Sequence, residues 1–524
     1  MKQGNTLEDA ISSLFKDYGQ GYGLDFGTFR SQMAYKNAND NMATITTYDN
    51  PLNRNGIPCL FWYSAEKQKE FVCHEVLSLN GHLNDPKGIC SSIKMKLEEN
   101  YIFLNGKRYT PSYIAEQIIR KVLLISHYSI KKQLSAEPTY KKLVVGVPVR
   151  FGTIKRQLLK KVLIKATDNK EIVLLPEPIA AAITYAKLFP LSNNILIFDL
   201  GAGSFDTVLL EINKHRTKEN PYMYTPKHPD GLEIAGNYFD QKVQEIIIEK
   251  LMLNPGLIDL SKITNNQHPD YLRLKEDARK AKELLSTEEQ VTLSIKGTSA
   301  TGGSCLQKVS ISRTEFENAI NPAVTEIVNC AYNVLERANL HHSKNVSIFL
   351  VGGSTYIPFV KDMIRSKFKY IDEKKIVQVY PEHAIAMGCA IFANEEVCHT
   401  PIAYAYAIGT HLQLSNKDVL DVIIPSYATT PIKKQLTYYT RYPNQNSITL
   451  DFFELDYGEP DATLDIDVGN PMHSHARHYF GKKVPARTPV DVTIELSKDG
   501  ILTASFDDRG ISNIDKQTVS IADI

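Results

Sequence analysis

The chain has 524 residues, more than one hydrophobic core can hold, so three or more domains or subdomains are expected. Its 60 basic and 59 acidic residues nearly balance, which gives no support for a nucleic-acid or membrane-surface partner. No apolar run approaches the roughly 18 residues of a spanning helix, and residues 1–9 lack the apolar core of a secretion signal. The seven cysteines contain no Cys-x-x-Cys pair, which argues against a disulfide framework or zinc site and favours a reducing cytoplasm.

Residues 1–19 are expected to form an N-terminal extension, and the first informative motif follows them. It is an acidic, glycine-containing turn near residue 25, and a second turn of the same kind occurs near residue 200. The two turns read Gly23-Leu24-Asp25-Phe26-Gly27-Thr28 and Asp199-Leu200-Gly201-Ala202-Gly203-Ser204-Phe205-Asp206. Runs typical of β-strands flank both, so each turn is predicted to join the two strands of a hairpin.

These two turns have the chemistry of a phosphate clamp. Glycine lets the backbone adopt positive φ and brings N–H groups against a phosphate without an intervening Cβ. A hydroxyl side chain adds a donor, and an aspartate beside a polyphosphate requires a cation, most simply magnesium with its waters. The duplicated turn therefore predicts a two-lobed protein that binds a nucleotide.

Between residues 20 and 395 the predicted strands and helices alternate, which indicates an α/β fold. Residues 120–134 and 239–252 have helical periodicity. Residues 271–286 are predicted to form a charged, exposed helix. The apolar positions of this helix are Leu272, Ala278, Ala281 and Leu285.

The residue pattern changes after about residue 400, where short β-branched or aromatic runs are separated by turn residues. Residues 490–496 alternate apolar and polar side chains, and an Asp-Gly hairpin signal follows at Asp499-Gly500. We therefore predict an interdomain linker over residues 396–407 and an all-β sandwich domain over residues 408–524.

Three further motifs lie in the α/β part. They read Leu175-Pro176-Glu177-Pro178-Ile179-Ala180, Val351-Gly352-Gly353-Ser354-Thr355-Tyr356-Ile357-Pro358 and Pro381-Glu382-His383-Ala384-Ile385-Ala386. The second follows an apolar strand and opens a helix, a geometry suited to a nucleoside or phosphate. Each motif alone is weak. The five motifs in this order, followed by a β domain, resemble the seventy-kilodalton heat-shock chaperone family, the DnaK-like proteins, over about residues 20–520.

This resemblance implies an actin-like ATPase domain over residues 20–395, whose two lobes close over ATP or ADP with Mg²⁺. The positions implied for catalysis are Lys94, Glu177, Asp199 and Ser204, and Asp25 and Asp206 would position the magnesium waters. The other nucleotide-binding positions implied are Gly27, Thr28, Phe29, Gly201, Ala202, Gly203, Gly236, Lys282, Ser286, Gly352, Gly353, Ser354 and Glu382. The chemistry is the positioning of one water and electrostatic relief of the γ-phosphate, so no nucleophilic side chain is required. Pro148 and Arg156 match residues that link the nucleotide state to the rest of the domain.

Several positions depart from the family pattern. Asn237 and Tyr238 replace two acidic residues, and Arg279 replaces a glutamate near the base and ribose, so adenosine affinity is expected to be reduced or retuned. The join between the domains lacks the family's acidic–leucine–acidic stretch. Val173 stands where the family has a basic residue that J-domain partners use. Coupling between the domains and stimulation by a J-domain protein are therefore open questions.

The resemblance also implies that the β domain binds extended apolar segments of unfolded polypeptides in a cleft, through backbone hydrogen bonds and an apolar pocket. The matching positions are Thr410, Leu412, Tyr438, Ile448 and Leu450, with Gln413 and Arg441 as arch residues. The alternating side chains are equally typical of a sandwich core, and this alternative stays open. Because the chain stops at Ile524, where the family's helical lid begins, we expect no lid and fast peptide exchange.

Two other functions remain open beside an ATP-dependent chaperone with J-domain and nucleotide-exchange partners. One is a nucleotide-binding scaffold or regulator with little ATPase activity. The other, less favoured because of the β domain, is a small-molecule kinase on the actin-like fold. His473, His475 and His478 form a cluster that could bind a metal, but a solvated loop is favoured.

Overall fold

The structure is a computed structural model of the chain. It describes residues 20–36, 44–45, 56–79, 81–134, 140–167, 171–189, 192–213, 224–253, 257–378, 381–395, 398, 400–412, 417–455, 458–459, 462–465, 474–512 and 517–520. The expected N-terminal extension, much of the start of the expected linker, Gln413 and His473 lie outside the described residues.

The first lobe is built on a mixed sheet in which the strand order is β11-β10-β1-β2-β3, with β4 paired to β2. β1 and β2 form an antiparallel hairpin, whereas β10 lies parallel to β1 and β11 parallel to β10. The strands are β1 Gln20–Phe26, β2 Arg30–Lys36, β3 Thr44–Ile45, β4 Ile57–Pro58, β10 Tyr140–Val147 and β11 Ile172–Pro176. Helices α4 Pro111–Leu134 and α5 Thr153–Thr167 add their apolar faces to the core of this lobe.

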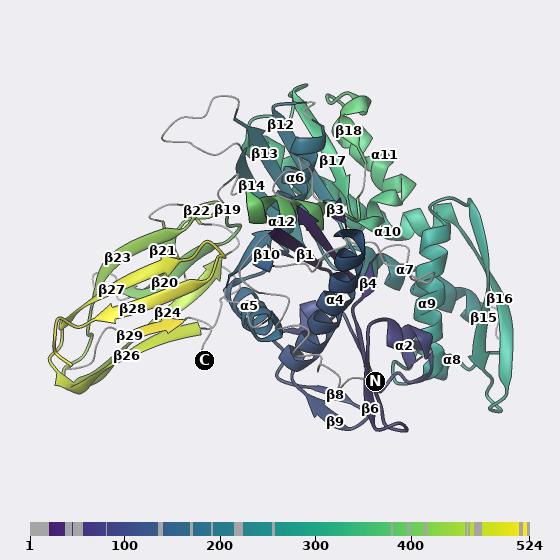
Figure 1. The fold of residues 1–524 in the computed structure, drawn as a ribbon, viewed down its shortest axis with the longest axis horizontal. Coiled ribbons are helices and arrows are strands. Elements are labelled where there is room, and N and C mark those ends of the chain that lie inside the picture. The colour runs from purple at the N-terminus through teal and green to yellow at the C-terminus, as the bar shows by residue number, and fades with distance from the viewer. Residues whose placement is uncertain are drawn as a thin grey trace.

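Smaller elements complete the first lobe (Figure 1). They are β5 Leu60–Ser64, β6 Lys69–Val72, β7 Ile89–Ser91, β8 Ile102–Leu104, β9 Lys107–Tyr109, α2 His74–Ser78, α3 Gly81–Asn84 and the 3₁₀ helix η1 Ile93–Lys96. The helix predicted over residues 120–134 is confirmed, but it begins earlier, at Pro111. Proline suits a first helical turn because its missing N–H has no partner there in any case.

The second lobe repeats this plan around a sheet in which the strand order is β14-β13-β12-β17-β18. Its strands are β12 Asn194–Leu200, β13 Phe205–Ile212, β14 Tyr224–Leu232, β17 Val346–Val351 and β18 Ile376–Val377. Helices α7 Gly236–Leu253, α8 Leu260–Ile263, α9 Pro269–Leu284, α10 Arg313–Arg337 and α11 Pro358–Lys367 belong to it, with η2 Gly353–Tyr356, η3 Glu373–Lys375 and the β15 Gln290–Thr298 and β16 Ser304–Ser312 ribbon. In α9 the buried apolar residues are Leu274, Ala278 and Ala281, whereas Leu272 is half-buried.

Two helices rich in small residues, α6 Glu177–Leu188 and α12 Ala384–Asn394, pack against each other in a core shared by strands of both sheets. A Cβ on Gly388 would lie 1.7 Å from the carbonyl oxygen of Ala180. Glycine is therefore required for this close approach of the two helices. The contact fixes the lobes around a common centre (Figure 1).

The C-terminal part is a β sandwich of two sheets, with strand orders β25-β21-β20-β24-β26 and β23-β27-β28-β29. Its strands are β19 Thr400–Pro401, β20 Ala405–Leu412, β21 Lys417–Ile424, β22 Thr429–Thr430, β23 Ile432–Tyr439, β24 Gln445–Leu455, β25 Thr463–Asp465, β26 Ser474–Val484, β27 Pro489–Leu496, β28 Leu502–Asp507 and β29 Gln517–Ser520. β19 and the start of β20 fall within the range 396–407 that was expected to be a linker. The short strand β19 pairs with β22, and this pairing draws those residues into the sandwich.

Two of the three clustered histidines lie on strand β26, so the expectation of a solvated loop is wrong for them. His475 is exposed, whereas His478 is buried, packs against Phe506 and contacts Asp508 at 3.0 Å. Within the described residues no group of three or more histidine, cysteine or acidic side chains could hold a metal ion. The same residues contain no helix with the length and apolar character needed to span a membrane.

Candidate functional site

Both acidic turns join the strands of hairpins, as predicted: the first connects β1 to β2 and the second connects β12 to β13. In the second hairpin Asp199 and Asp206 face each other directly in the strand register. The two turns meet at the centre of the molecule, because a Cβ on Gly203 would lie 2.6 Å from Thr28 Oγ1. The structure thus places two glycine turns from different lobes on opposite sides of one small space.

Four acidic side chains and one lysine gather beside these turns: Asp25, Lys94, Glu177, Asp199 and Asp206. Lys94 comes from η1 in the first lobe and forms an ion pair with Glu177, the first residue of α6. Both of these side chains are buried. In the part of the chain that the structure describes, no other lysine or arginine lies within ion-pair distance of the cluster. The site therefore concentrates negative charge.

The pKa values of the aspartates follow from this crowding. Burial, together with the charge of Glu177, raises the pKa of Asp25 to about 7, against the opposing effect of Lys94. Burial and the neighbouring carboxylates raise the pKa of Asp199 well above its usual range. The Oδ2 atom of Asp199 is buried and has no hydrogen-bond partner among the described residues. An added cation would stabilise a site of this kind, because it favours the ionised carboxylates.

Asp206 is held on both oxygens. The backbone N–H of Val149 donates to its Oδ1 at 2.6 Å, and the Ser204 hydroxyl donates to its Oδ2 at 2.8 Å. Burial and the charge of Glu177 nevertheless raise its pKa to about 7, although these hydrogen bonds act in the opposite direction. The geometry fixes this carboxyl group at the start of β13.

The second turn is also where positions expected to line the nucleoside come together. The hydroxyl of Ser354 donates to the carbonyl of Gly201 at 2.8 Å, and the N–H of Gly236 donates to the same carbonyl at 3.1 Å. Lys282 Nζ donates to the carbonyl of Gly236 at 3.3 Å, and the hydroxyl of Ser286, just after the end of α9, donates to the carbonyl of Lys282 at 3.4 Å. The structure therefore brings these five residues together.

The glycine pair after β17 lies against the same turn. Gly352 has φ of 81°, and a Cβ there would lie 2.3 Å from the carbonyl oxygen of Leu200. Only glycine fits that close approach. A Cβ on Gly353 would lie 3.8 Å from Glu382 Oε1, which brings Glu382 to the edge of the site.

Arg279 connects the two lobes in a way that sequence reasoning missed. Its guanidinium lies 5.5 Å from the ring centroid of Phe29, in the first turn, and Arg30 lies at the same distance from that ring. Glu276 and Glu283 on α9 hold Arg279 at 2.7 and 2.5 Å. The acidic neighbours at i−3 and i+4 indicate these ion pairs along one helix face, but they give no sign of the contact with Phe29.

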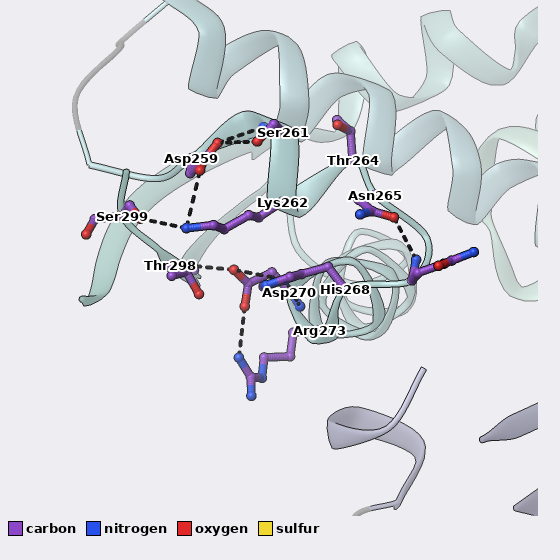
Figure 2. A network of polar contacts seen from close by, with 12 residues as sticks. Asp259, Ser261, Lys262, Thr264, Asn265, His268, Asp270, Arg273, Thr298 and Ser299 are labelled. Carbon is purple, nitrogen blue, oxygen red and sulfur yellow. Dashed lines mark hydrogen bonds and ion pairs between the residues drawn. The ribbon is translucent and has the colours of Figure 1, made fainter. Parts of the chain in front are cut away.

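A second contact between the lobes lies near the start of α9, and Figure 2 shows the network that supports it. Asp270 is fully buried, accepts from the N–H of Thr298 at 2.8 Å and forms an ion pair with Arg273 at 2.9 Å. The other arm of the Arg273 guanidinium reaches Asn84 of α3 in the first lobe, at 3.4 Å. Helix α9 therefore touches the opposite lobe at two points.

The expected peptide-binding residues lie in and around the core of the sandwich. Ile448 and Leu450 are buried in it, and Tyr438 packs against it from β23. Thr410 is half-buried on β20, whereas the surroundings of Leu412 lie outside the description. This placement agrees with the alternative that these side chains form ordinary core. The Tyr438 hydroxyl, however, is buried without a hydrogen-bond partner among the described residues, so one polar group there stays unpaired.

The β sandwich docks on the first lobe through α5 and β11. Arg156 on α5 donates to the carbonyl of Asp499 at 3.2 Å and reaches the carbonyl of Pro148 at 3.5 Å. Lys160 forms an ion pair with the Asp499 carboxylate. The same carboxylate accepts from the backbone N–H of Leu174, at 2.8 Å. The Asp-Gly turn predicted as a hairpin signal is thus also a docking point.

The sandwich also contacts the second lobe. Asp230 on β14 forms ion pairs with Arg150 at 2.8 Å and Arg337 at 2.7 Å. From the sandwich, the Tyr404 hydroxyl donates to the carbonyl of Arg150 at 3.0 Å, and Arg337 donates to the Tyr427 hydroxyl at 2.6 Å. The β domain therefore rests on both lobes at once.

These elements define a class of protein: two lobes with a pair of glycine turns around a buried acidic site, followed by a docked β sandwich. A family model described as Hsp70 protein matches residues 85–523, and the chain belongs to this family. The chain is 26% identical to the chaperone protein DnaK of Thermosipho melanesiensis over 516 residues, which cover 95% of this chain and 80% of the relative. It is 28% identical to the chaperone protein DnaK of Thermoplasma volcanium over 456 residues, 84% of this chain and 68% of the relative.

Proposed function

We propose that the protein is an ATP-dependent chaperone that binds and hydrolyses Mg-ATP between its lobes and binds extended apolar polypeptide segments through its β domain. The observation that carries this proposal is the buried group of four carboxylates and one lysine beside two touching glycine turns. The relatives are named as chaperones, and this supports the same role here.

The phosphates would lie between the two turns. Backbone N–H groups of Gly27, Thr28, Gly201 and Gly203 would donate to them, since glycine turns expose such groups. Lys94 would meet the γ-phosphate, and its ion pair with Glu177 keeps the ammonium in place. These positions relieve the negative charge of the transferred phosphoryl group, which is the main demand of this reaction.

Asp25 and Asp206 fit a magnesium ion that is held through water. Their carboxylates are ionised with difficulty, as raised pKa values show, and a divalent cation favours the ionised form. When bound, Mg²⁺ would neutralise charge on the phosphates. The hydrogen bonds from Val149 and Ser204 hold Asp206 toward this position.

Asp199 and Glu177 are suited to orient the attacking water. The unpaired Oδ2 of Asp199 is a hydrogen-bond acceptor with nothing to accept from among the described residues. A water donating to it would be positioned beside Lys94 and Glu177. Because its pKa is raised, Asp199 can also take up the proton that the water loses.

The docked β domain would transmit the nucleotide state to the peptide site. Asp206 is bonded to Val149, whose neighbour Arg150 contacts the sandwich through Tyr404. In the β domain the unpaired Tyr438 hydroxyl could bond the backbone of an extended client segment. A J-domain protein and a nucleotide-exchange factor are the partners expected to regulate this cycle.

A nucleotide-binding scaffold with little hydrolysis is the second candidate. It is favoured by Arg279, which is held by Glu276 and Glu283 and stacks on Phe29 instead of presenting a carboxylate to the nucleoside. A contact that keeps the two lobes closed and slows ATP hydrolysis would suit a scaffold.

Single-turnover hydrolysis of Mg-ATP by the purified protein, with and without an excess of an extended apolar peptide, separates these functions. We expect hydrolysis that the peptide accelerates, and a loss of about 100-fold or more in Asp199→Ala. Asp362→Asn, at an exposed position on α11, should match the unaltered protein. ATP that binds and stays intact would support the scaffold, and hydrolysis indifferent to peptide would mean that the domains are uncoupled.

A further inference from the structure

A cavity of about 490 Å³ lies on the second lobe, away from the glycine turns and from the β sandwich. It is lined by residues of α10, by the segment after that helix, and by the C-terminal half of α11 with the residues that follow. In Figure 1, α11 stands at the upper right of the molecule and the sandwich at the left. A volume of this size is in the range of small-molecule sites, and none of the residues proposed above lines it.

The charge of this cavity is positive. Lys367 and Lys369 line it, and no aspartate or glutamate does. Over the described residues neither ammonium group has a carboxylate within 4 Å. Of the acidic residues near them along the chain, Asp362 and Glu373 pair with Arg365, at 3.0 and 2.9 Å, and Asp372 accepts from the backbone N–H of Lys374 at 2.9 Å. The two lysines therefore keep an unbalanced charge that favours an anionic ligand.

Lys367 is held in position before any ligand binds. Its Nζ atom donates to Asn329 Oδ1 at 2.7 Å and lies 4.3 Å from the ring centroid of Tyr332. Both partners belong to α10, so the ammonium spans the gap between the two helices. Fixing a long side chain in this way lowers the entropy that binding would otherwise cost.

Aromatic rings form the remaining wall. His342 and Tyr370 lie 4.6 Å apart in an edge-to-face arrangement, and both line the cavity with Tyr332. His342 is exposed and Tyr370 is 42% exposed, so their rings are open to a ligand. Rings of this kind offer flat surfaces to a planar group, while the lysines offer charge to an acidic one.

We propose that this cavity binds a small organic phosphate with a planar ring. Its phosphate would lie at Lys367 and Lys369, and its ring would pack against Tyr332, His342 or Tyr370. Two ammonium groups in one cavity suit a dianion better than a single carboxylate, since each can donate to a different oxygen. This site is independent of the nucleotide cleft and of the proposed ATPase.

Calorimetric titration of the full chain with phenyl phosphate tests the proposal. Inorganic phosphate probes the phosphate group alone, and benzyl alcohol probes the aromatic ring alone. We expect phenyl phosphate to bind more tightly than inorganic phosphate, and benzyl alcohol not to bind. The double variant Lys367→Gln/Lys369→Gln should weaken phenyl phosphate binding about tenfold or more. Lys374→Gln, an exposed lysine of η3 outside the cavity, is the matched control and should leave it unchanged.

Tyr370→Ala tests the ring contribution without altering charge. It should weaken phenyl phosphate about threefold and leave inorganic phosphate unaffected, as expected for one lost stacking contact. The proposal is overturned if phenyl phosphate does not bind, if the double lysine variant binds it as tightly as Lys374→Gln, or if inorganic phosphate binds equally well. Phenyl phosphate that binds in the nucleotide cleft would still bind to the double lysine variant. The binding that this variant loses is therefore the binding in the cavity.

Discussion

The carboxylate of Asp499, in a turn of the β sandwich, accepts a hydrogen bond of 2.8 Å from the backbone N–H of Leu174, in the edge strand of the first-lobe sheet. An edge strand exposes backbone groups that need partners. The backbone N–H of Leu174 is paired by a side chain of the β sandwich and not by another strand. Since Lys160 pairs with the same carboxylate, one residue anchors two elements of the lobe.

Asp499→Ala should release the sandwich from the first lobe. The change leaves a buried N–H unpaired and removes an ion pair, a combined cost of about 2–4 kcal/mol to the docked state. Small-angle scattering of the nucleotide-free protein should show a larger radius of gyration. Asp451→Ala, at an exposed position of β24, is the matched control and should leave the radius unchanged. Equal radii for the two variants would mean that Asp499 does not hold the domains together.

Lys94→Met should destabilise the first lobe strongly. It leaves Glu177 buried without its cation, and breaking a buried pair of this kind costs about 3–5 kcal/mol. Lys107→Met breaks an exposed pair with Glu70 and should cost about 1 kcal/mol or less. The fluorescence of Trp62, the single tryptophan, reports urea unfolding of this lobe. A similar urea midpoint for both variants would contradict the prediction.

Binding of Mg-ADP should release protons at pH 6. Asp25 and Asp206 have pKa values of about 7, against 3.8 unperturbed, so at pH 6 they are mostly protonated, and a cation beside them drives the protons off. The release should fade by pH 8.5, where both are already ionised. Calorimetry in two buffers of different ionisation enthalpy measures it, and Asp206→Asn should reduce the release. Without ligand, the same two groups make the folded state lose stability as pH rises from about 4 to about 7, because the folded state holds protons that the unfolded chain gives up.

Arg279→Ala should speed nucleotide release. Its contact with Phe29 joins the lobes, and a partly exposed contact between a cation and a ring contributes about 0.5–1 kcal/mol, or roughly a two- to fivefold change in rate. Dissociation of a fluorescent ADP analogue measures the effect. Lys280→Ala, on the next position of α9 and largely exposed, is the control. An unchanged rate in Arg279→Ala would show that the Phe29 contact does not limit opening.

Much of the fold could be predicted from local pattern. Strand pairs around the acidic turns are recognisable because apolar runs flank short glycine segments, as at Asp199 and Asp206. The β sandwich follows from alternation in residues 490–496 and from the Asp-Gly turn. Which sheet each strand joins could not be predicted, because pairings such as β12 with β17 link residues far apart in the chain.

Sequence motifs allowed individual residues of the candidate site to be proposed. They did not predict the contacts that these residues make with distant elements. Glu177 and Lys94 could be named, but the ion pair between them depends on how α6 and η1 pack. The contact between Arg279 and Phe29 joins residues from different lobes and leaves no local pattern. His478 was misplaced for a related reason: its burial comes from Phe506 and Asp508, which approach only after the sandwich closes.

The hydrogen bond from Val149 to Asp206 has a consequence for genetics. Asp206 belongs to the acidic site, while Val149 begins the short segment that carries Arg150 toward Tyr404 of the sandwich. A single substitution at Asp206 would thus impair both the proposed nucleotide site and the connection from that site to the β sandwich. Its phenotype would combine the two losses. Substitutions at Ser204 and at Tyr404 should each impair one of these two properties, because Ser204 contacts Asp206 and Tyr404 contacts Arg150. Complementation between the two alleles would show that the site and the connection can be separated.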